Sequence, residues 1–291
     1  MKNTNTRLAL FLAFLTTMLE AQEKEAPVTV DTLSNNVFML TGKGGNVGLY
    51  IGKNEAYMID DQYDYMSEPL KQTIAGLTSK PIAYLFNTHM HGDHTGGNSN
   101  FNSETTTIVA HDNVRKRLKE QSKTTTKNDP TLPEITFSDD LTFFDGEETI
   151  MVFHVHNAHT DGDAMIYFLK DNILHMGDTY FAMRYPFIDL NSGGSVEGYI
   201  RAHKKAMVLI DEDTKIIPGH GRPSNKKELE AYVLMLEDLK AKVTQEIAKG
   251  KSLEEVKNNN GLSAAYDAIH GGGFIKPEVI RETFYMSLNK N

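Results

Sequence analysis

Four side chains that can bind a metal ion lie within the six residues His89-Met90-His91-Gly92-Asp93-His94. Imidazole nitrogens and carboxylate oxygens together suit zinc or a similar first-row divalent ion, and two neighbouring ions need about this many ligands. His89 and His91 can face one ion while Asp93 and His94 face another. The alternative is a solvated polar loop with chance histidines, but this density of ligand types favours a metal site.

An apolar segment, residues 82–86, directly precedes the cluster and predicts a buried strand that delivers it at the carboxyl end. Strand-like and helix-like segments recur along the rest of the chain. Strands are predicted at residues 37–40, 47–51, 57–59, 107–110, 149–155, 164–169, 172–175 and 215–217, and helices at residues 69–76, 113–121, 195–209, 226–249 and 277–288. Two strand-rich segments, each followed by helices, indicate two sheets packed together with helices outside.

The segment from Asn87 to Asn98 resembles the H-x-H-x-D-H signature of the metallo-β-lactamase superfamily. Three later positions resemble the further metal motifs of that superfamily in the same order, namely His159, Asp178 and His220. The resemblance spans roughly residues 37–223. It implies an α/β fold, an αββα sandwich of two mixed β-sheets with helices on the outer faces.

The resemblance also implies a dinuclear zinc site. Carried over residue by residue, the ligands of the first ion are His89, His91 and His159, those of the second are Asp93, His94 and His220, and Asp178 bridges the two. A water held between two cations has its pKa lowered to about 7, which supplies a hydroxide nucleophile for opening a carbonyl-centred bond. Asp93 is in addition the candidate catalytic residue for moving a proton.

One branch of the superfamily has a cysteine at the bridging position, where this chain has Asp178 and contains no cysteine at all. The aspartate, together with His94, makes the chain more similar to glyoxalase II-like thioesterases and metal-dependent lactonases than to the cysteine-bearing β-lactamases. Export from the cytoplasm, by contrast, would suit an enzyme that encounters antibiotics, which favours a β-lactam substrate. The expected substrate is therefore a β-lactam-type amide, a lactone or a thioester.

Several other residues are weaker candidates. Asp60 or Asp61 is expected to orient a ligand imidazole by contacting its second ring nitrogen. The alternative is that these residues only form a turn. His203 is expected on a helix surface, and the His270–Phe274 segment is a possible loop near the cleft. Substrate contacts are suspected for Tyr180, Arg184 and Tyr185, and His154 and His156 are expected to be structural.

Composition excludes several classes of protein. Of 291 residues 40% are hydrophobic, which excludes disorder as the main state, and 30 Lys+Arg against 39 Asp+Glu give a net charge of −9. An acidic chain without a basic block is unsuited to nucleic acid, so a small-molecule substrate is expected. Without cysteine there is no disulfide and no thiolate metal site.

Residues 1–21 have the layout of a secretory signal peptide, with Lys2 and Arg7 before the apolar residues 8–15 and Ala21 before a polar stretch. The apolar run is too short for a stable membrane anchor, and it has no polar face, which disfavours the alternative of an amphipathic helix. We expect cleavage near Ala21, a single domain over residues 22–291, and a periplasmic or secreted protein.

The sequence thus predicts an exported, zinc-dependent hydrolase of small molecules with two ions per chain. Two alternatives remain open. One is a phosphodiesterase or nuclease of the same superfamily, which the acidic charge disfavours. The other is a non-hydrolytic metal-binding or iron-dependent redox protein, which the identity of the metal would distinguish.

Overall fold

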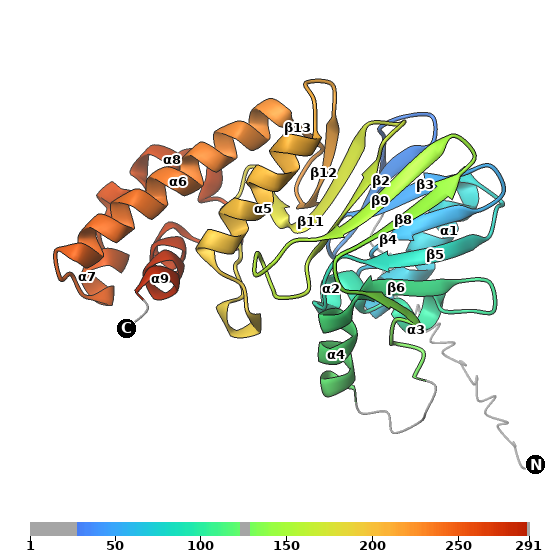
Figure 1. The fold of residues 1–291 in the computed structure, drawn as a ribbon, viewed down its shortest axis with the longest axis horizontal. Coiled ribbons are helices and arrows are strands. Elements are labelled where there is room, and N and C mark those ends of the chain that lie inside the picture. The colour runs from blue at the N-terminus through green and yellow to red at the C-terminus, as the bar shows by residue number, and fades with distance from the viewer. Residues whose placement is uncertain (1–27, 123–128, 290–291) are drawn as a thin grey trace, which may run out of the picture.

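The computed structural model describes residues 28–122 and 129–289 (Figure 1). The predicted signal peptide, residues 1–21, lies outside the described residues. In the described part of the chain, no helix is both long enough and apolar enough to cross a membrane.

The first sheet has seven strands that follow one another in chain order. The first four form an antiparallel meander, and the last three are added in parallel. These strands are β1 (Thr29–Thr32), β2 (Val37–Thr41), β3 (Val47–Ile51), β4 (Ala56–Ile59), β5 (Ile82–Asn87), β6 (Thr107–His111) and β7 (Ile135–Phe137).

The second sheet has six strands in the order β13, β12, β11, β10, β9, β8. Its neighbours are antiparallel except for β11 and β12, which run parallel. These strands are β8 (Asp140–Asp145), β9 (Glu148–His154), β10 (Ala164–Phe168), β11 (Ile173–Phe181), β12 (Lys215–His220) and β13 (Ser224–Asn225).

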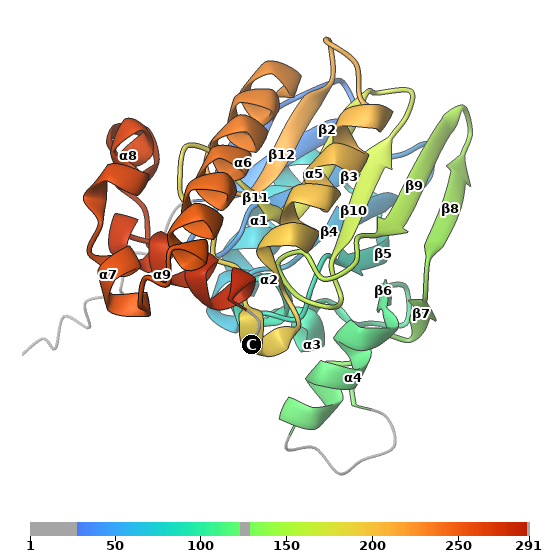
Figure 2. The same ribbon diagram turned by 60° about the vertical axis from the view of Figure 1, so that its left-hand side comes forward.

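Helices cover the outer face of each sheet, as Figure 2 shows for α5 and α6 over the second sheet. The α-helices are α1 (Ser67–Leu77), α2 (Gly92–Thr95), α3 (Asn98–Phe101), α4 (Asp112–Gln121), α5 (Val196–Leu209), α6 (Lys226–Ala248), α7 (Leu253–Lys257), α8 (Ala264–His270) and α9 (Pro277–Leu288). Short 3-10 helices are η1 (Asp64–Met66), η2 (Leu190–Ser192) and η3 (Asn260–Leu262).

Three apolar layers hold this arrangement together. Leu70 and Ile74 of α1 pack on Leu49 in the first sheet, whereas the next residue of that strand, Tyr50, points between the two sheets and stacks on Phe168 of the second. Successive side chains of a strand point to opposite faces, so a strand covered on both sides is a continuous apolar run. A third layer joins the second sheet to α5, α6 and α9. The four layers confirm the predicted αββα sandwich.

Candidate metal centre

The carboxyl ends of β5, β11 and β12 carry the polar motifs to one edge of the sandwich. Strand β5 ends at Asn87, and the loop that follows holds His89 and His91 before the single turn of α2 presents Asp93 and His94. Asp178 lies near the end of β11 and His220 at the end of β12, which pairs with β11. Both sheets therefore contribute side chains to the same edge.

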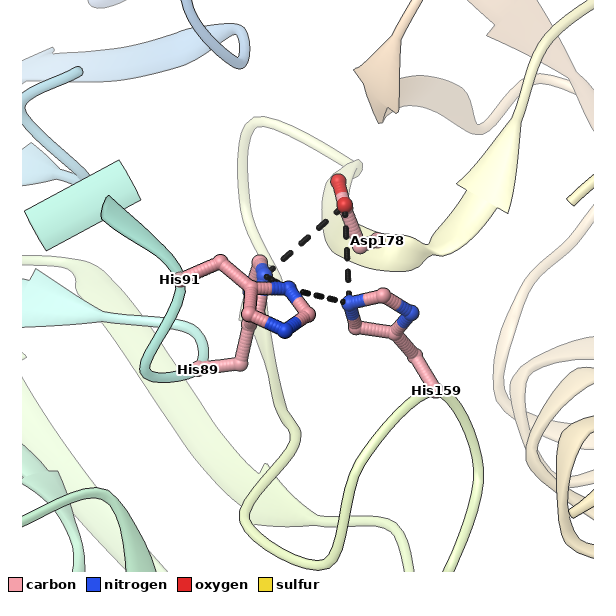
Figure 3. Close-up of side chains that lie close together, drawn as sticks. All are labelled: His89, His91, His159 and Asp178. Carbon is pink, nitrogen blue, oxygen red and sulfur yellow. Dashed lines mark hydrogen bonds and ion pairs between the residues drawn. The ribbon is translucent and has the colours of Figure 1, made fainter. Parts of the chain in front are cut away.

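His89, His91, His159 and Asp178 form the first group, in which one ligand atom from each residue lies within 4.8 Å of all the others (Figure 3). The Nδ1 atom of His91 is 3.1 Å from His89 Nε2 and 2.9 Å from His159 Nε2. Asp178 Oδ2 is 3.7 Å from His89 Nε2 and 3.6 Å from His159 Nε2. Three ring nitrogens and a carboxylate oxygen thus converge on one point.

Asp93, His94 and His220 form the second group, again within 4.8 Å. His220 Nε2 is 3.3 Å from Asp93 Oδ2, and His94 Nε2 is 3.5 Å from His220 Nε2. Asp178 Oδ1 is 3.0 Å from His94 Nε2 and 3.3 Å from His220 Nε2. One oxygen of Asp178 therefore faces each group, which is the position that a bridging ligand requires.

The donors fit divalent cations. Converging ring nitrogens repel one another through their lone pairs unless a proton or a cation lies between them. Asp178 Oδ1 is fully buried yet forms no hydrogen bond of good geometry within the described residues. Such an orphaned buried oxygen is costly without a compensating charge. Imidazole and carboxylate without thiolate suit zinc and other first-row divalent ions.

Electrostatics separate the histidines of the two groups. Burial and the neighbouring imidazoles lower the pKa of His89 well below its usual value, and burial lowers the pKa of His159 to about 4. Burial alone would lower the pKa of His94 too, but the carboxylates of Asp178 and Asp60 raise it well above its usual value. Burial would raise the pKa of Asp178, yet the neighbouring imidazoles hold it well below its usual value. His89 and His159 are thus held as neutral imidazoles, the form that binds metal.

Asp60 orients ligands of both groups, which settles the choice between Asp60 and Asp61. Asp60 Oδ2 is 2.7 Å from His94 Nδ1 and accepts the Thr88 hydroxyl at 2.8 Å. That hydroxyl oxygen is in turn 3.0 Å from His89 Nδ1. Asp61 instead accepts a backbone N–H from the loop after α2. Holding Nδ1 in this way leaves Nε2 of each ring facing the centre.

Two further supports were missed by the sequence analysis. Asp189 Oδ2 is 3.1 Å from His91 Nε2, and His159 Nδ1 donates to the backbone oxygen of Phe187 at 2.7 Å. The other carboxylate oxygen of Asp189 caps η2 by accepting N–H groups at 3.1 Å. The sequence around Asp189 signals a turn, and nothing in it indicates a contact with a histidine 98 residues away.

A cavity of about 430 Å³ opens over the two groups. Its lining combines the polar centre with aromatic side chains: Tyr63, His91, Gly92, Asp93, Asp178, Phe181, Arg184, Tyr185, Phe187, His220, Phe274 and Ile275. Arg184 and Tyr185 line it as suspected, and Phe274 places the glycine-rich loop beside the cleft. The suspicion about Tyr180 was wrong, because its ring is buried and its hydroxyl pairs with Ser224.

The remaining histidines lie outside both groups. His154 is buried and stacks on His111 with ring centroids 3.8 Å apart, which agrees with its predicted structural role, and His156 is exposed. The prediction that His203 is on the surface was wrong. Its ring is fully buried and stacks on Tyr232, because α5 is covered by α6 on the face that carries it.

Comparison with known proteins agrees with this geometry. Residues 40–220 match the family described as the metallo-beta-lactamase superfamily. A hydroxyacylglutathione hydrolase from Pelagibacter ubique (strain HTCC1062) is 26% identical over 216 residues, which cover 72% of this chain and 76% of the relative.

Similar solved structures include the DIM-1 metallo-beta-lactamase, with a TM-score of 0.62, 22% identity, and coverage of 72% of this chain and 97% of that one. A metallo-beta-lactamase from Pontibacter korlensis gives a TM-score of 0.61 at 19% identity, covering 72% of this chain and 99% of that one. These likenesses show the fold. With the matched family spanning both ligand groups, the chain belongs to the metallo-beta-lactamase superfamily, as a metal-dependent hydrolase.

Proposed function

We propose that this protein is a zinc-dependent hydrolase with two ions per chain, and that it cleaves a thioester or a lactone of a small molecule in preference to a β-lactam. The position of Asp178, with one oxygen toward each ligand group, is the observation that carries the proposal. The hydroxyacylglutathione hydrolase relative supports the thioester, because its name describes hydrolysis of such a bond.

His89, His91 and His159 would hold the first ion, Asp93, His94 and His220 the second, and Asp178 both. When bound, zinc lowers the pKa of a coordinated water to about 7 and polarises a carbonyl oxygen.

The chain's own residues supply positioning and proton transfer. Asp93 lines the cavity with 23% of its side chain exposed, so it can also receive a proton from the attacking water and pass it to the leaving group. Arg184 at the rim is suited to an anionic group of the substrate. The aromatic walls around the centre exclude water from the reacting bond.

The test is hydrolysis by the zinc-loaded protein of three substrates: a chromogenic cephalosporin, an acyl lactone and an acyl thioester. We expect thioester or lactone turnover that a chelator abolishes, with a trace of cephalosporin turnover at most. The variant His89→Ala should lose metal and activity together, whereas His156→Ala, an exposed histidine outside both groups, should keep both. Full activity with empty metal sites would refute the proposal, and efficient cephalosporin turnover would reverse the substrate order.

Asp93→Asn tests the proton-transfer role separately. We expect the fold to persist while turnover falls by about 10²–10⁴-fold, the usual contribution of general acid–base catalysis. Circular dichroism and zinc content of the same preparation distinguish lost proton transfer from lost metal. Turnover close to that of the wild type would remove Asp93 from the mechanism.

We also propose that the chain is exported, on the strength of the signal-peptide pattern in residues 1–21. Expression of the full chain in a Gram-negative host should yield a periplasmic protein that begins near Gln22. Amino-terminal sequencing measures this directly, and an intact amino terminus in the cytoplasmic fraction would contradict it.

A further inference from the structure

The outer wall of the cavity includes a segment beyond the residues that match the superfamily. Phe274 and Ile275 line the cavity, whereas the matched region ends at residue 220. Both lie in the connection between α8 and α9. This part of the wall therefore lies outside the region that matches the superfamily.

Packing on both sides holds this connection in place. The Tyr185 N–H donates to the His270 backbone oxygen at 3.0 Å, and Ile275 is only 5% exposed. Gly273 lies so close to Arg184 that a Cβ there would be 3.1 Å from the Cβ and Cγ of Arg184. Because Gly273 has no side chain, the backbone of this connection can approach the Arg184 side chain closely. The connection therefore packs against the rim of the cavity.

The Phe274 side chain, by contrast, is 85% exposed. Its ring lies edge-to-face on Phe187, with centroids 6.3 Å apart and an interplanar angle of 87°. The Phe187 ring in turn lies 5.8 Å from the ring of His91 and 5.6 Å from that of His159. Aromatic surface thus continues from the ligands of the first group to the mouth of the cavity.

We infer that Phe274 is a specificity-determining residue that selects substrates with a bulky apolar group, preferably aromatic, on the acyl side of the scissile carbonyl. An exposed phenyl ring gains most from a partner that removes its surface from water, and aromatic pairs add edge-to-face or stacking contacts. Arg184, against which the same connection is seated, lies beside this wall and suits a carboxylate on the substrate. The substrate class is therefore an amphipathic acyl compound with an anionic end. This inference deepens the proposed hydrolase function, and its kinetic test rests on that function.

A binding test independent of turnover uses the absence of tryptophan from the chain. Phe274→Trp introduces a single indole at the wall, and Phe144→Trp, at a phenylalanine of β8 that is 76% exposed, is the matched control. The zinc-loaded variants are titrated with phenylacetate and with acetate. We expect phenylacetate to change the emission of Phe274→Trp saturably, at a concentration at least about tenfold lower than acetate, and to leave Phe144→Trp unchanged. An unchanged Phe274→Trp emission, or an equal change in both variants, would overturn the inference.

The kinetic test compares the phenylacetyl and acetyl thioesters of 3-mercaptopropionate, which share a carboxylate. Phe274→Ala should raise the ratio of the phenylacetyl KM to the acetyl KM by about tenfold, with a smaller effect on the ratio of kcat values. Phe144→Ala should leave both ratios at wild-type values.

The two tests separate the two proposals. Turnover of both thioesters with an unchanged KM ratio overturns the role of Phe274 and leaves the hydrolase standing. A saturable phenylacetate response without turnover of any thioester or lactone overturns the proposed function and supports the apolar wall.

Discussion

Asp60 links the two ligand groups through a few short contacts. It contacts His94 directly and His89 through the Thr88 hydroxyl, and it is fully buried. Its backbone has a φ of 60°, a conformation that asparagine and aspartate tolerate better than other side chains. Asp60 also accepts the Thr88 backbone N–H at 2.7 Å, so three hydrogens point to this carboxylate, and its contacts fix which nitrogen of each imidazole faces the metal.

Asp60→Asn should therefore lower zinc affinity about 10–100-fold while keeping the backbone conformation. The amide NH₂ would oppose either the Thr88 backbone N–H, which Oδ1 now accepts, or both the Thr88 hydroxyl and the Nδ1–H of His94, which Oδ2 accepts, so at least one contact must be lost. Asp61→Asn is the matched control, because Asp61 is equally buried and accepts only a backbone N–H. Zinc titration against a competing chelator measures both. Equal affinities for the two variants would show that Asp60 does not orient the ligands.

The burial of His203 predicts that the free energy of unfolding depends on pH. Burial lowers its pKa from 6.5 to about 4, so the folded state holds this ring neutral. Protonation of the ring therefore favours the unfolded state. The free energy of unfolding is highest above pH 6.5 and falls as the pH drops toward 4. The fall between pH 6.5 and pH 5 amounts to about 1.5 kcal/mol for this single group.

The variant His203→Phe should lack this loss of stability at low pH. Its phenyl ring suits the aromatic neighbours Tyr199 and Tyr232. Urea denaturation of both proteins at pH 6.5 and pH 5 gives the difference. Identical pH dependence in the wild type and the variant would mean that folding does not shift the pKa of His203.

The spacing of ligand types predicted His89, His91, Asp93 and His94, and the resemblance to the superfamily added the other three residues that the structure brings to the same place: His159, Asp178 and His220. Asp189, Phe187 and Phe274 carry no such signal. Their contacts with the centre depend on how the loops after β11 and the carboxyl-terminal helices fold back. His203 was misplaced because a polar residue on a helix is usually solvent-facing, and tertiary cover by α6 reversed that preference.

At the level of elements, α4 braces the loop that carries His159. Arg117 Nε and Nη2 donate to the two oxygens of Asp161 at 2.7 and 2.8 Å, and Asn113 donates to the Asp161 backbone oxygen at 2.8 Å. A bidentate pair of this kind adds geometric definition as well as energy. The loop is therefore held from outside as well as by the sheet.

Arg117→Ala should cost about 1 kcal/mol or less in global stability, since the pair is partly exposed, but should loosen this loop locally. Hydrogen exchange at residues 157–163 should become faster, while exchange in β9 and β10 stays as in the wild type. Lys116→Ala, at the exposed neighbouring position, is the control. If exchange in the loop does not change, then the β-sheet alone positions His159.

Strands with two covered faces were the most predictable elements, because their sequences are continuous apolar runs. The edge strands β1 and β8 were missed, since β1 is exposed along its length and β8 alternates between exposed and half-buried positions. Strand β11 was predicted to end at His175 but continues to Phe181. Gly177 has a φ of 51°, and the pairing of β11 with β12 shifts register on either side of it. The sequence around Gly177 therefore resembles that of a turn, although the strand continues through it.

For the whole molecule, the ligand groups join the two sheets. His89, His91, Asp93 and His94 follow β5 of the first sheet, whereas Asp178 and His220 belong to β11 and β12 of the second. An ion that binds both sets is lost when the sheets separate. Metal binding is therefore coupled to the stability of the sandwich and not to the centre alone.

Removal of metal should accordingly lower the melting temperature of the whole sandwich. At a free zinc concentration one hundred times Kd, each ion adds about 2.7 kcal/mol, and a change of 1 kcal/mol shifts Tm by about 2–4 °C in a protein approaching this size. Chelation should thus lower Tm by at least about 5 °C in a single cooperative transition, measured by calorimetry with and without added zinc. His156→Ala should show the same shift, and His89→Ala a smaller one. Unchanged Tm after complete chelation would mean that the buried carboxylates and imidazoles already satisfy one another, since the sheets would then remain joined without any ion.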